Sequence, residues 1–516
     1  MGSIVKVKNK NGTTYIYSNN TIWDKETKKY KYNRKVIGKV TPDGETIMYE
    51  DEKPLLVKSS ICYGNTYFLN ELGYKIGLNN IIKKIFPDTY NDIIALSHYM
   101  ICQDSSLSNS PKWFELNYSN LSNILSSQRI SDLLKQIDEE KILSFFKDWV
   151  KYRLEKEYIA YDITSISSYS ELIELVELGY NRDKEKLPQI NMGMFFGEES
   201  KIPVFYNIYQ GSIKDVKTIP NMLKYCDILK INKIKFVMDK GFYSDSNITE
   251  LYKSKKHFTI AVPFKSALAC NIVKEVKNTI HKPSKIIINS GRELVYGLTI
   301  EDKWTYWDNN EEKSFKLYKH IMYDDDKRNE IETRIIDKVS KLKEELEKYI
   351  SIHHKAPDDI TKYTKYFNIK KTRSNIKIEI KDENIEEELQ YEGYLVIFSN
   401  DIKDVKEVFK TYRRKDVVEK AFDNLKNDLD IKRLKVHKLS TLKGKMFIAF
   451  ISLILKTVIF NIIEDNNLKH DSSTNELIRE LQKISLIDFN NKKVLTEISS
   501  TQKKIFTTFK IKEPCI

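Results

Sequence analysis

The pattern of apolar and polar positions changes in kind along the chain, and each change predicts a different structure. Residues 1–57 alternate between apolar and polar side chains, which is typical of antiparallel hairpins. Residues 58–155 instead repeat their apolar side chains with the spacing of amphipathic helices. We therefore expect a β-hairpin module followed by a helical lobe. The expected hairpin turns are Asn11-Gly12, Ser18–Asn20 and Pro42-Asp43-Gly44.

Short apolar segments after residue 156 predict strands that are buried on both faces. Tyr158–Thr164 and Ile234–Gly241 each carry an aspartate, Asp162 and Asp239, near the carboxyl end. Either aspartate alone could be a helix cap or a turn residue. A buried carboxylate is unfavourable unless it has a partner, and open α/β sheets place their sites at this end of their strands. The pair therefore indicates a site. Further strands are expected at 189–196, 202–208, 257–262 and 393–399, with helices at 215–229 and up to Lys253.

Residues 410–435 predict a helix that places one carboxylate among cations. Along one face, side chains follow at alternating spacings of three and four residues, so this face drifts by only about 20° per seven residues. An adjoining apolar stripe would pack the helix on a core. The pattern also fits an amphipathic surface helix whose Glu419 merely pairs with Lys415. The face consists of Tyr412, Lys415, Glu419, Phe422 and Lys426.

The chain between Asp239 and Glu419 is too long to be a single loop, so residues 266–390 are expected to fold as an insertion. Strand-like segments at 285–289, 294–299 and 314–322 precede a charged helix at about 330–351. Trp304 and Trp307 lie in this insertion, and a tryptophan in a β segment is commonly a core residue.

The C-terminal part of the chain predicts a basic segment and a long apolar helix. Residues 431–438 form a basic strand or turn suited to phosphate contacts, with Lys432, Arg433 and Lys435. Residues 446–463 are apolar but short for a membrane span, and they carry Lys456 near their middle. We therefore expect a buried core helix and no membrane partner.

Composition narrows the class of partner. The 516 residues suggest several domains. The net charge of +13 favours a polyanionic partner, so the helical lobe could bind DNA, pair with itself or only provide packing. Five scattered cysteines contain no C-x-x-C pair, and the N-terminus has no apolar signal region. These features indicate neither a disulfide framework nor a zinc site, and they fit a reducing cytosol.

Three features together give the chain a resemblance to a known family. The motif Y-D-x-T contains Asp162, V-M-D-K-G-F-Y contains Asp239, and the helix carries Tyr412, Lys415, Glu419 and Lys426. These resemble the DDE transposases of bacterial insertion sequences, in particular the cut-and-paste group with the signature Y-x2-R-x3-E-x6-K. This chain has Lys415 at the arginine position, and Arg414 beside it is a substitute candidate.

The resemblance implies an α/β fold class: a ribonuclease-H-like mixed-sheet core with a mostly β insertion domain, an N-terminal β-hairpin module and a helical lobe. The expected domains are residues 1–57 (hairpin module), 58–155 (helical lobe), 156–265 (first part of the core), 266–390 (insertion), 391–465 (second part of the core) and 466–516 (C-terminal helical segment).

The resemblance also implies the chemistry and the partners. Asp162, Asp239 and Glu419 would be catalytic and would hold two Mg²⁺ or Mn²⁺ ions, because hard cations prefer oxygen ligands and a metal pair stabilises both the entering and the leaving oxygen of a phosphodiester. The partner would be double-stranded DNA, both the transposon ends and the target, bound by a homodimer in the bacterial cytoplasm at the nucleoid. Residues expected to contact DNA are Tyr412, Arg414, Lys415, Lys426, Lys432, Arg433, Lys435, Trp304 and Trp307.

Two other classes of function remain open at this point. A protein of the same fold could be a nuclease that does not transpose, or a DNA-binding protein that has lost activity. A structural or scaffolding protein would leave the three acidic residues without a role.

Overall fold

The structure is a computed structural model that describes residues 3–10, 12–24, 29–49, 57–103, 105–121, 123, 125–153, 158–197, 200–231, 235–290, 293–357, 359–371, 376–466, 473–489 and 492–516. The chain divides into two compact units. The smaller unit comprises residues 1–61, 485–497 and 515–516, and the larger comprises residues 62–484 and 498–514.

The smaller unit contains two sheets. Its first sheet has the order β1-β2-β3-β4 and joins Ser3–Lys8, Thr14–Asp24, Lys29–Val40 and Thr46–Met48. The turn expected at Pro42-Asp43-Gly44 falls between β3 and β4, with a hydrogen bond from Gly44 N–H to Thr41 C=O at 3.0 Å. Of the turn expected at Asn11-Gly12, Gly12 lies between β1 and β2, and Asn11 is outside the described residues. The turn expected at Ser18–Asn20 is absent, because these residues pair with β1 and β3 inside β2. The second sheet has the order β19-β18-β5 and joins Lys492–Leu495, Ser485–Phe489 and Val57–Cys62.

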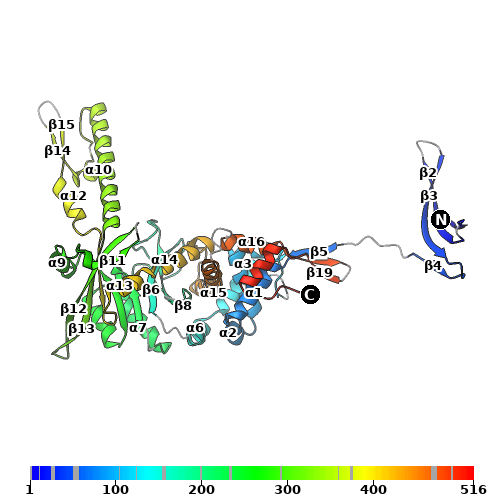
Figure 1. Ribbon diagram of the computed structural model, residues 1–516, viewed down its shortest axis with the longest axis horizontal. Helices are drawn as coiled ribbons and strands as arrows, with labels where there is room; N and C mark the ends of the chain where they lie inside the picture. Colours follow the sequence, from blue (N-terminus) through cyan, green and yellow to red (C-terminus); the bar gives the residue numbers. More distant parts are fainter. Residues whose placement is uncertain are drawn as a thin grey trace. The chain divides into compact units, whose positions relative to one another are not determined.

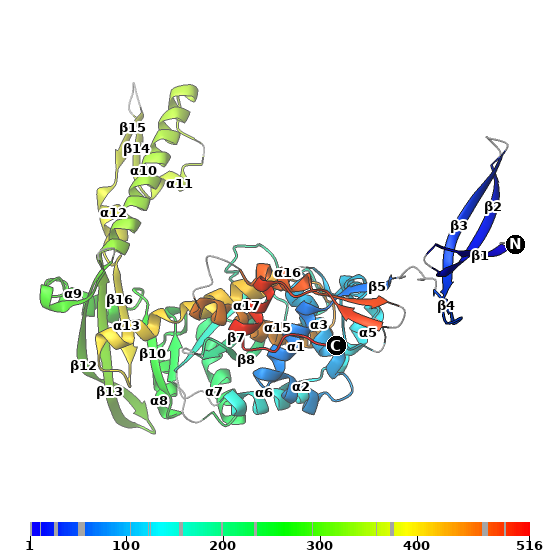
Figure 2. The same cartoon turned by 45° about the vertical axis from the view of Figure 1, so that its right-hand side comes forward.

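The larger unit contains a mixed sheet with the strand order β11-β12-β13-β16-β10-β9-β6-β7-β8 (Figures 1 and 2). Strand β6 pairs in parallel with β9, which pairs in parallel with β10, while the pairs toward both edges are antiparallel. Six of these strands were expected from apolar segments: β6 (Tyr158–Ser168), β7 (Gln189–Gly197), β8 (Pro203–Gln210), β9 (Lys235–Met238), β10 (His257–Val262) and β16 (Tyr394–Ser399).

One edge of β6 is left open in the middle of the sheet. Strand β9 (Lys235–Met238) pairs with β6 only as far as Tyr161. On the same side the short strand β17 (Arg433–Leu434) begins to pair only at Ser167. Between these two partners β6 is paired on its other side alone, with β7. The stretch of β6 that starts at Asp162 is therefore accessible to side chains from other segments.

Helices cover the sheet and form the lobe beside it. In the chain between β8 and β11 lie α7 (Ile219–Ile228), α8 (Asp245–Lys253), α9 (Ala267–Val276) and the short turns η2 (Asp215–Thr218), η3 (Lys240–Phe242) and η4 (Pro283–Lys285). The lobe consists of α1 (Gly64–Lys75), α2 (Leu78–Ile85), α3 (Tyr90–Cys102), η1 (Leu107–Asn109), α4 (Ser110–Phe114), α5 (Ser127–Gln136) and α6 (Glu139–Arg153).

The apolar helix α15 (Leu439–Asp465) is the centre of this lobe and contacts α3 and α5 (Figures 1 and 2). Among the described residues it is the one helix long and apolar enough to cross a membrane, and most of that apolar stretch is buried inside the protein. Phe447 packs edge-on against Phe145 of α6 at 5.1 Å between ring centroids. Lys456, which counts against a membrane span, is itself buried and lies 3.0 Å from an Asp428 carboxylate oxygen.

The insertion differs from the expected separate, mostly β domain. Its strands β11 (Ile286–Asn289), β12 (Leu294–Asp308) and β13 (Glu311–Asp324) extend the main sheet, because β13 pairs with β16. The rest packs around the long helix α10 (Asp325–His353) with its own small core, which includes Leu346 and Tyr366 (Figure 2). Its other elements are α11 (Thr361–Thr364), β14 (Phe367–Lys371), β15 (Ile376–Ile380) and α12 (Asp382–Leu389).

The C-terminal segment is helical only in part. Helices α16 (Thr474–Gln482) and α17 (Ser500–Thr508) each begin with a capping box, at Ser473 and at Ser499, which satisfies backbone N–H groups at the helix start. Between them lies the hairpin β18–β19. The expectation of an all-helical segment at 466–516 was therefore wrong at 485–495, where Leu486 and Ile487 pair across the hairpin with Leu495 and Val494.

Candidate active site

Asp162 and Asp239 occupy neighbouring positions at the open edge of β6. Tyr161 of β6 lies opposite Met238 of β9 in the parallel ladder, so each aspartate is the next residue along its strand. Strand β6 continues to Ser168, beyond the end expected from the sequence, and Asp162 lies in its interior. Asp162 and Asp239 each follow one residue of the pair Tyr161–Met238. Because adjacent strands lie only about 4.8 Å apart, the two carboxylates are brought together.

Asp162 is a buried carboxylate with one cationic partner. It is 5% exposed, accepts a hydrogen bond from the Ile163 N–H at 2.8 Å, and lies 3.2 Å from the Arg182 guanidinium. Burial raises the pKa of Asp162 to about 6, although Arg182 and Lys415 oppose the shift. The same guanidinium donates to Asp215 at 2.7 Å. Arg182 therefore bridges two aspartates from different parts of the chain.

Asp239 is held by donors from three places. It accepts hydrogen bonds from the Tyr412 hydroxyl at 2.8 Å and from the Lys240 N–H at 2.8 Å, and it lies 3.6 Å from the Lys415 ammonium. Burial acts to raise the pKa of Asp239, but Lys415 and these two hydrogen bonds outweigh it and lower the pKa. Asp239 is therefore the more readily ionised of the two aspartates.

Glu419 joins the pair through Lys415. Lys415 is buried, and its Nζ lies 3.3 Å from Glu419 Oε1 as well as 3.6 Å from Asp239 Oδ2. These two oxygens are therefore at most 6.9 Å apart, the sum of the two distances. Burial lowers the pKa of Lys415, but the surrounding carboxylates, with Asp239 foremost, raise it overall. The ammonium is thus charged and sits among three acidic residues. The Glu419 side chain is 61% exposed.

The single helix expected at 410–435 is in fact three segments. Helix α13 (Val405–Arg413) ends at a turn, α14 (Asp416–Asp423) begins after Lys415, and a π-helical turn, η5 (Asn424–Asp428), follows. A hydrogen bond from Lys415 N–H to Tyr412 C=O, at 3.2 Å, spans three residues where an α-helix would span four, and it marks the break. Tyr412, Lys415 and Glu419 still meet at the two aspartates.

Lys426 does not join this group of contacts. The π-helical turn changes the direction of its side chain, which is buried and lies 2.8 Å from Asp183. An ideal helix would have kept Lys426 on the Glu419 face, but one extra residue per turn shifts the face. The expected shared stripe therefore stops before Lys426.

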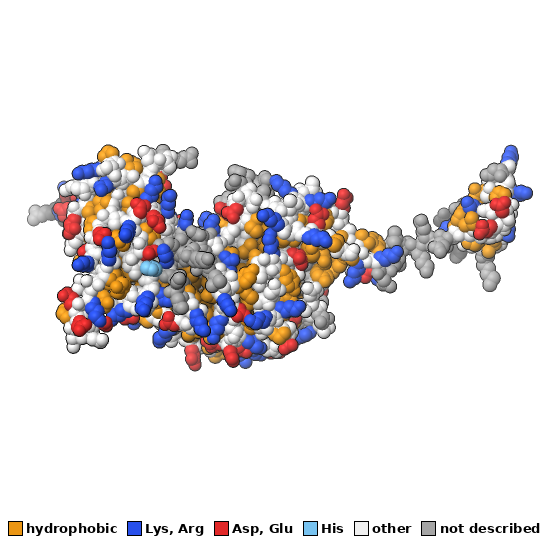
Figure 3. Space-filling view, turned by 60° about the horizontal axis from the view of Figure 1, so that its bottom comes forward, with side chains coloured by type: hydrophobic (Ala, Val, Ile, Leu, Met, Phe, Trp, Pro, Cys, Tyr) orange, Lys and Arg blue, Asp and Glu red, His pale blue; other side chains and the backbone are white. Residues whose placement is uncertain are grey.

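The other basic candidates are exposed, and three of them pair with acidic side chains. Arg433 donates to Glu185 at 3.1 Å and to the Tyr169 hydroxyl at 2.9 Å, and Lys432 lies 3.9 Å from Glu185. Lys435 pairs with Asp430 at 2.8 Å, and Arg414 is exposed. In the view of Figure 3, Lys and Arg side chains are mixed with Asp and Glu over the larger unit. The net positive charge is therefore not concentrated in one patch on that face.

The two tryptophans of the insertion lie on the same strand with different exposure. Trp307 is 70% exposed, whereas Trp304 is half-buried and donates through its indole N–H to Thr249 at 3.2 Å. Both line a groove between β12 and α8. Trp304 thus combines a packing role with access to the groove, and Trp307 is the more available ring.

Sequence reasoning missed the acidic and basic residues of the loops that surround the open edge. Arg182, Asp183 and Glu185 lie in the connection from β6 to β7, and Asp215 begins η2. The connection is polar and aperiodic, so nothing in its pattern distinguishes these residues. The one available signal was that the run N-R-D-K-E-K brings alternating charges between two segments expected to be buried strands.

The donor set suits a hard divalent cation, although the three acids are not gathered into a metal-binding cluster. In the described part of the chain no group of three or more His, Cys, Asp or Glu side chains is arranged to hold a metal ion. Asp162 and Asp239 offer carboxylate oxygens from adjacent strand positions, and Mg²⁺ and Mn²⁺ prefer oxygen ligands. Arg182 and Lys415 currently supply the positive charge that a cation would supply.

Removing the charge of Asp162 is expected to stabilise the protein at high pH. Because burial raises this pKa from 3.8 to about 6, ionising Asp162 in the folded state costs roughly 1–3 kcal/mol. The contribution of the protonated Asp162 carboxyl to the free energy of unfolding is then fully present below about pH 4. It is lost as the pH rises through about 6. Asp162→Asn should match the wild type near pH 4 and exceed it at pH 8.

Urea unfolding at several pH values, with a chelator present, measures this difference. The matched control is Asp227→Asn, which changes an exposed aspartate of α7 and should give no pH-dependent gain. A constant difference between Asp162→Asn and the wild type from pH 4 to pH 8 would contradict the raised pKa.

Asp162 and Asp239 thus lie at the open edge of β6, and Tyr412 and Lys415 contact Asp239 there. A family model described as a transposase DDE domain matches residues 154–455. The chain therefore belongs to this family, and the membership supports transposase function. The matched region includes the whole group of residues around Asp162, Asp239 and Glu419.

Two further comparisons add less. No curated protein sequence matches the chain. Among solved structures the chain is similar to one described as the cryo-EM structure of piggyBac transposase synaptic complex with hairpin DNA; the two are 11% identical, the match covers 80% of this chain and 70% of that chain, and the TM-score is 0.33. At this TM-score the two chains cannot be compared residue by residue.

Proposed function

We propose that this protein is the transposase of a bacterial insertion sequence of the cut-and-paste group. It binds the terminal inverted repeats of its own element, hydrolyses phosphodiester bonds at the ends, and joins the 3′-hydroxyl ends to target DNA. The strands β8-β7-β6-β9-β10 are then its ribonuclease-H-like core. The catalytic residues are Asp162, Asp239 and Glu419.

One observation carries this proposal. Asp162 and Asp239 follow paired residues of adjacent parallel strands, and the Lys415 ammonium lies within 3.6 Å of both Asp239 and Glu419. Three acids that are far apart in the sequence thus share one neighbourhood. A fold that used these acids only as helix caps or surface charges would have no reason to bring them together at a sheet edge.

Each residue of the site then has a definable task. Asp162, Asp239 and Glu419 would hold two Mg²⁺ or Mn²⁺ ions, which when bound supply charge stabilisation at the entering and leaving oxygens of the phosphodiester. The Tyr412 hydroxyl orients Asp239 through its 2.8 Å hydrogen bond. Lys415 offers a buried cation to the phosphate as a point charge, since lysine cannot bind a phosphate bidentately as arginine does.

DNA contacts beyond the reacting phosphate are assigned to the exposed basic residues. Arg414, Lys432, Arg433 and Lys435 would meet the backbone of the ends, and Lys426 would do so if its pair with Asp183 opens. Trp304 and Trp307 would stack on bases beside the groove. We further propose that two copies assemble on the two ends, and that the protein acts in the bacterial cytoplasm.

A second candidate function rests on the cations at the acids. Arg182 lies against Asp162, and Lys415 lies between Asp239 and Glu419, so each of the three acids has a cationic partner without metal. This arrangement favours a DNA-binding protein of the same fold that has lost its catalytic activity.

A plasmid that carries both ends of the encoding element separates the two candidates. Purified full-length protein should release the element in Mg²⁺ or Mn²⁺ and leave it intact in a chelator, since hydrolysis needs the charge of the metal pair. Sequencing the products should show 3′ ends joined to new DNA. Retention of the ends in a binding assay, together with intact plasmid at every metal concentration, would establish the second candidate instead.

A further inference from the structure

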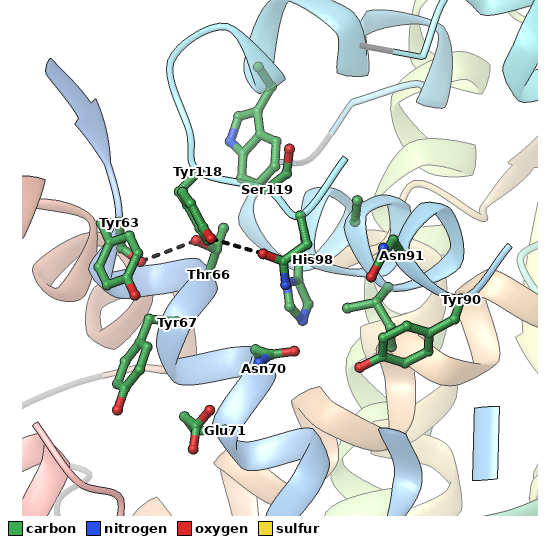
Figure 4. A pocket seen from close by; sticks show the side chains of 14 residues that line it. Tyr63, Thr66, Tyr67, Asn70, Glu71, Tyr90, Asn91, His98, Tyr118 and Ser119 are labelled. Atoms are coloured by element: carbon green, nitrogen blue, oxygen red, sulfur yellow. Dashed lines mark hydrogen bonds between the residues drawn. The ribbon is translucent and has the colours of Figure 1, made fainter. Parts of the chain in front are cut away.

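The helical lobe contains a small hollow that takes no part in the proposed chemistry. Its volume is about 190 Å³, which is below the roughly 300–1,000 Å³ of sites for drug-sized ligands and suits a single planar ring system. Helices α1 and α3 form two of its walls, and Trp113 and residues 118–120 close it. Figure 4 shows Tyr63 and Tyr67 on one side, Tyr90 and Asn91 on the other, and His98 between them.

Two buried polar atoms at this hollow have no hydrogen-bond partner among the described residues. They are Nε2 of His98, which is 5% exposed, and Nε1 of Trp113, which is 7% exposed. Burial lowers the pKa of His98 to about 3, so the imidazole is neutral. Buried polar groups are nearly always hydrogen-bonded, and an unpaired one calls for an explanation. The side chains of both residues line the hollow.

The lining selects a neutral aromatic ligand with hydrogen-bonding edges. Glu71 is the one charged side chain that lines it, and no lysine or arginine is among the described lining residues, so a phosphate or another anion does not fit. Aromatic rings offer stacking: Tyr63 and Tyr67 are themselves stacked, with centroids 5.6 Å apart. Amides that can pair with the edge of a base come from Asn70, Asn91 and Asn120.

A second hollow adjoins the first, and its lysines outnumber its one acidic side chain. It is lined by Lys75, Lys510 and Lys512 and shares Glu71 with the first. The two hollows are also connected by a 3.0 Å hydrogen bond from the Tyr90 hydroxyl to the Tyr74 hydroxyl. Lys510 is close enough to Lys75 to lower its pKa, after the effect of burial. Like charges that repel each other in this way are relieved by an anion.

We propose that these adjoining hollows bind one nucleotide of unpaired DNA, with its base in the aromatic hollow and its phosphate at the three lysines. An uncharged ring with polar edges fits the first hollow and an anion fits the second, and a nucleotide joins the two. The choice of DNA as the source rests on the proposed function. The site is separate from Asp162, Asp239 and Glu419, and an unpaired nucleotide is available wherever DNA ends are opened.

The test compares two probes on the full-length protein in a chelator, so that no cleavage occurs. One probe is a short single-stranded oligodeoxynucleotide, and the other is its abasic counterpart of equal length; both are followed by fluorescence anisotropy. Since stacking one base is worth up to a few kcal/mol, the protein should bind the probe with bases about tenfold more tightly. Asn91→Ala and Trp113→Phe should bring the two affinities close together.

Matched variants show which contact each hollow makes. Asn329→Ala removes an exposed asparagine of α10 and should leave the tenfold ratio unchanged, as a control for Asn91→Ala, which changes an exposed residue of α3. Lys512→Ala should weaken both probes alike and lower the salt dependence by about one phosphate. Asp162→Asn should retain the ratio, so failure of the catalytic proposal would not affect this result.

Two outcomes would overturn the nucleotide site. Equal binding of both probes by the wild type would show that the protein contacts only the backbone. A ratio that disappears in Trp307→Ala but persists in both Asn91→Ala and Trp113→Phe would assign base binding to the groove of the insertion.

Discussion

Asp162→Asn, Asp239→Asn and Glu419→Gln are each expected to lower cleavage of the element's ends by at least about 10²–10³-fold, the loss that follows when one group stabilising the developing charge is removed. Each change removes a negative ligand but keeps the side-chain shape, so the fold and the binding of ends should persist. Because the Glu419 side chain is 61% exposed, its variant is the least able to act through stability.

The measurement is the initial rate of plasmid cleavage at saturating protein, with end binding measured in parallel. Asp227→Asn and Glu387→Gln change exposed acids of α7 and α12 and should cleave at the wild-type rate. Wild-type cleavage by any one of the three site variants would show that this acid is not catalytic. Loss of binding without loss of cleavage at saturation would assign it to DNA contact.

Lys415→Met is expected to lower cleavage by about 10²-fold, since one positioned cation at a reacting phosphate acts mainly where charge develops. Methionine keeps much of the apolar stem but removes the ammonium that lies 3.6 Å from Asp239 and 3.3 Å from Glu419. These carboxylates would then repel each other without their shared cation. Affinity for the ends should change little, because Lys415 is 5% exposed and most of the proposed DNA contacts lie elsewhere.

Lys420→Met provides the matched control, since Lys420 is an exposed lysine of α14, the helix that begins directly after Lys415. Lys415→Arg distinguishes two roles. It should be neutral or slightly activating if Lys415 takes the signature's arginine position, and harmful if Arg414 already does so, because a second guanidinium would be crowded. A Lys415→Met enzyme that cleaves like Lys420→Met would leave Lys415 a purely structural cation.

Ion pairs at the acids also explain how the carboxylates are stabilised in the absence of a metal ion. Burying a carboxylate without a partner is costly. The Arg182 guanidinium is the partner of Asp162, and it also donates a hydrogen bond to Asp215. The pair uses a loop that precedes β7 and a turn that precedes α7. If another cation took the place of Arg182 beside Asp162, the guanidinium would leave Asp162 and would still donate to Asp215.

The elements whose apolar side chains repeat regularly could be predicted from the amino-acid pattern alone. The helical lobe, the buried strands around Asp162 and Asp239, and the apolar helix α15 follow from periodicity, because hydrophobic burial imposes the same spacing in any context. Motif spacing singled out three acids and two of their contacts, Tyr412 and Lys415. The turn expected at Ser18–Asn20 failed because polar residues are also tolerated in a strand with exposed faces.

Features that depend on contacts between distant segments could be seen only in the folded protein. Strand pairing at the edge of β16 joined the insertion to the main sheet, which no local pattern specifies. The break at Lys415 and the π-helical turn at Lys426 separated residues that an ideal helix would align, since packing of the apolar face overrides regular geometry. Arg182 and Asp215 entered the site only through the fold, because charged loop residues have no periodicity and only their placement in space reveals which carboxylate they meet.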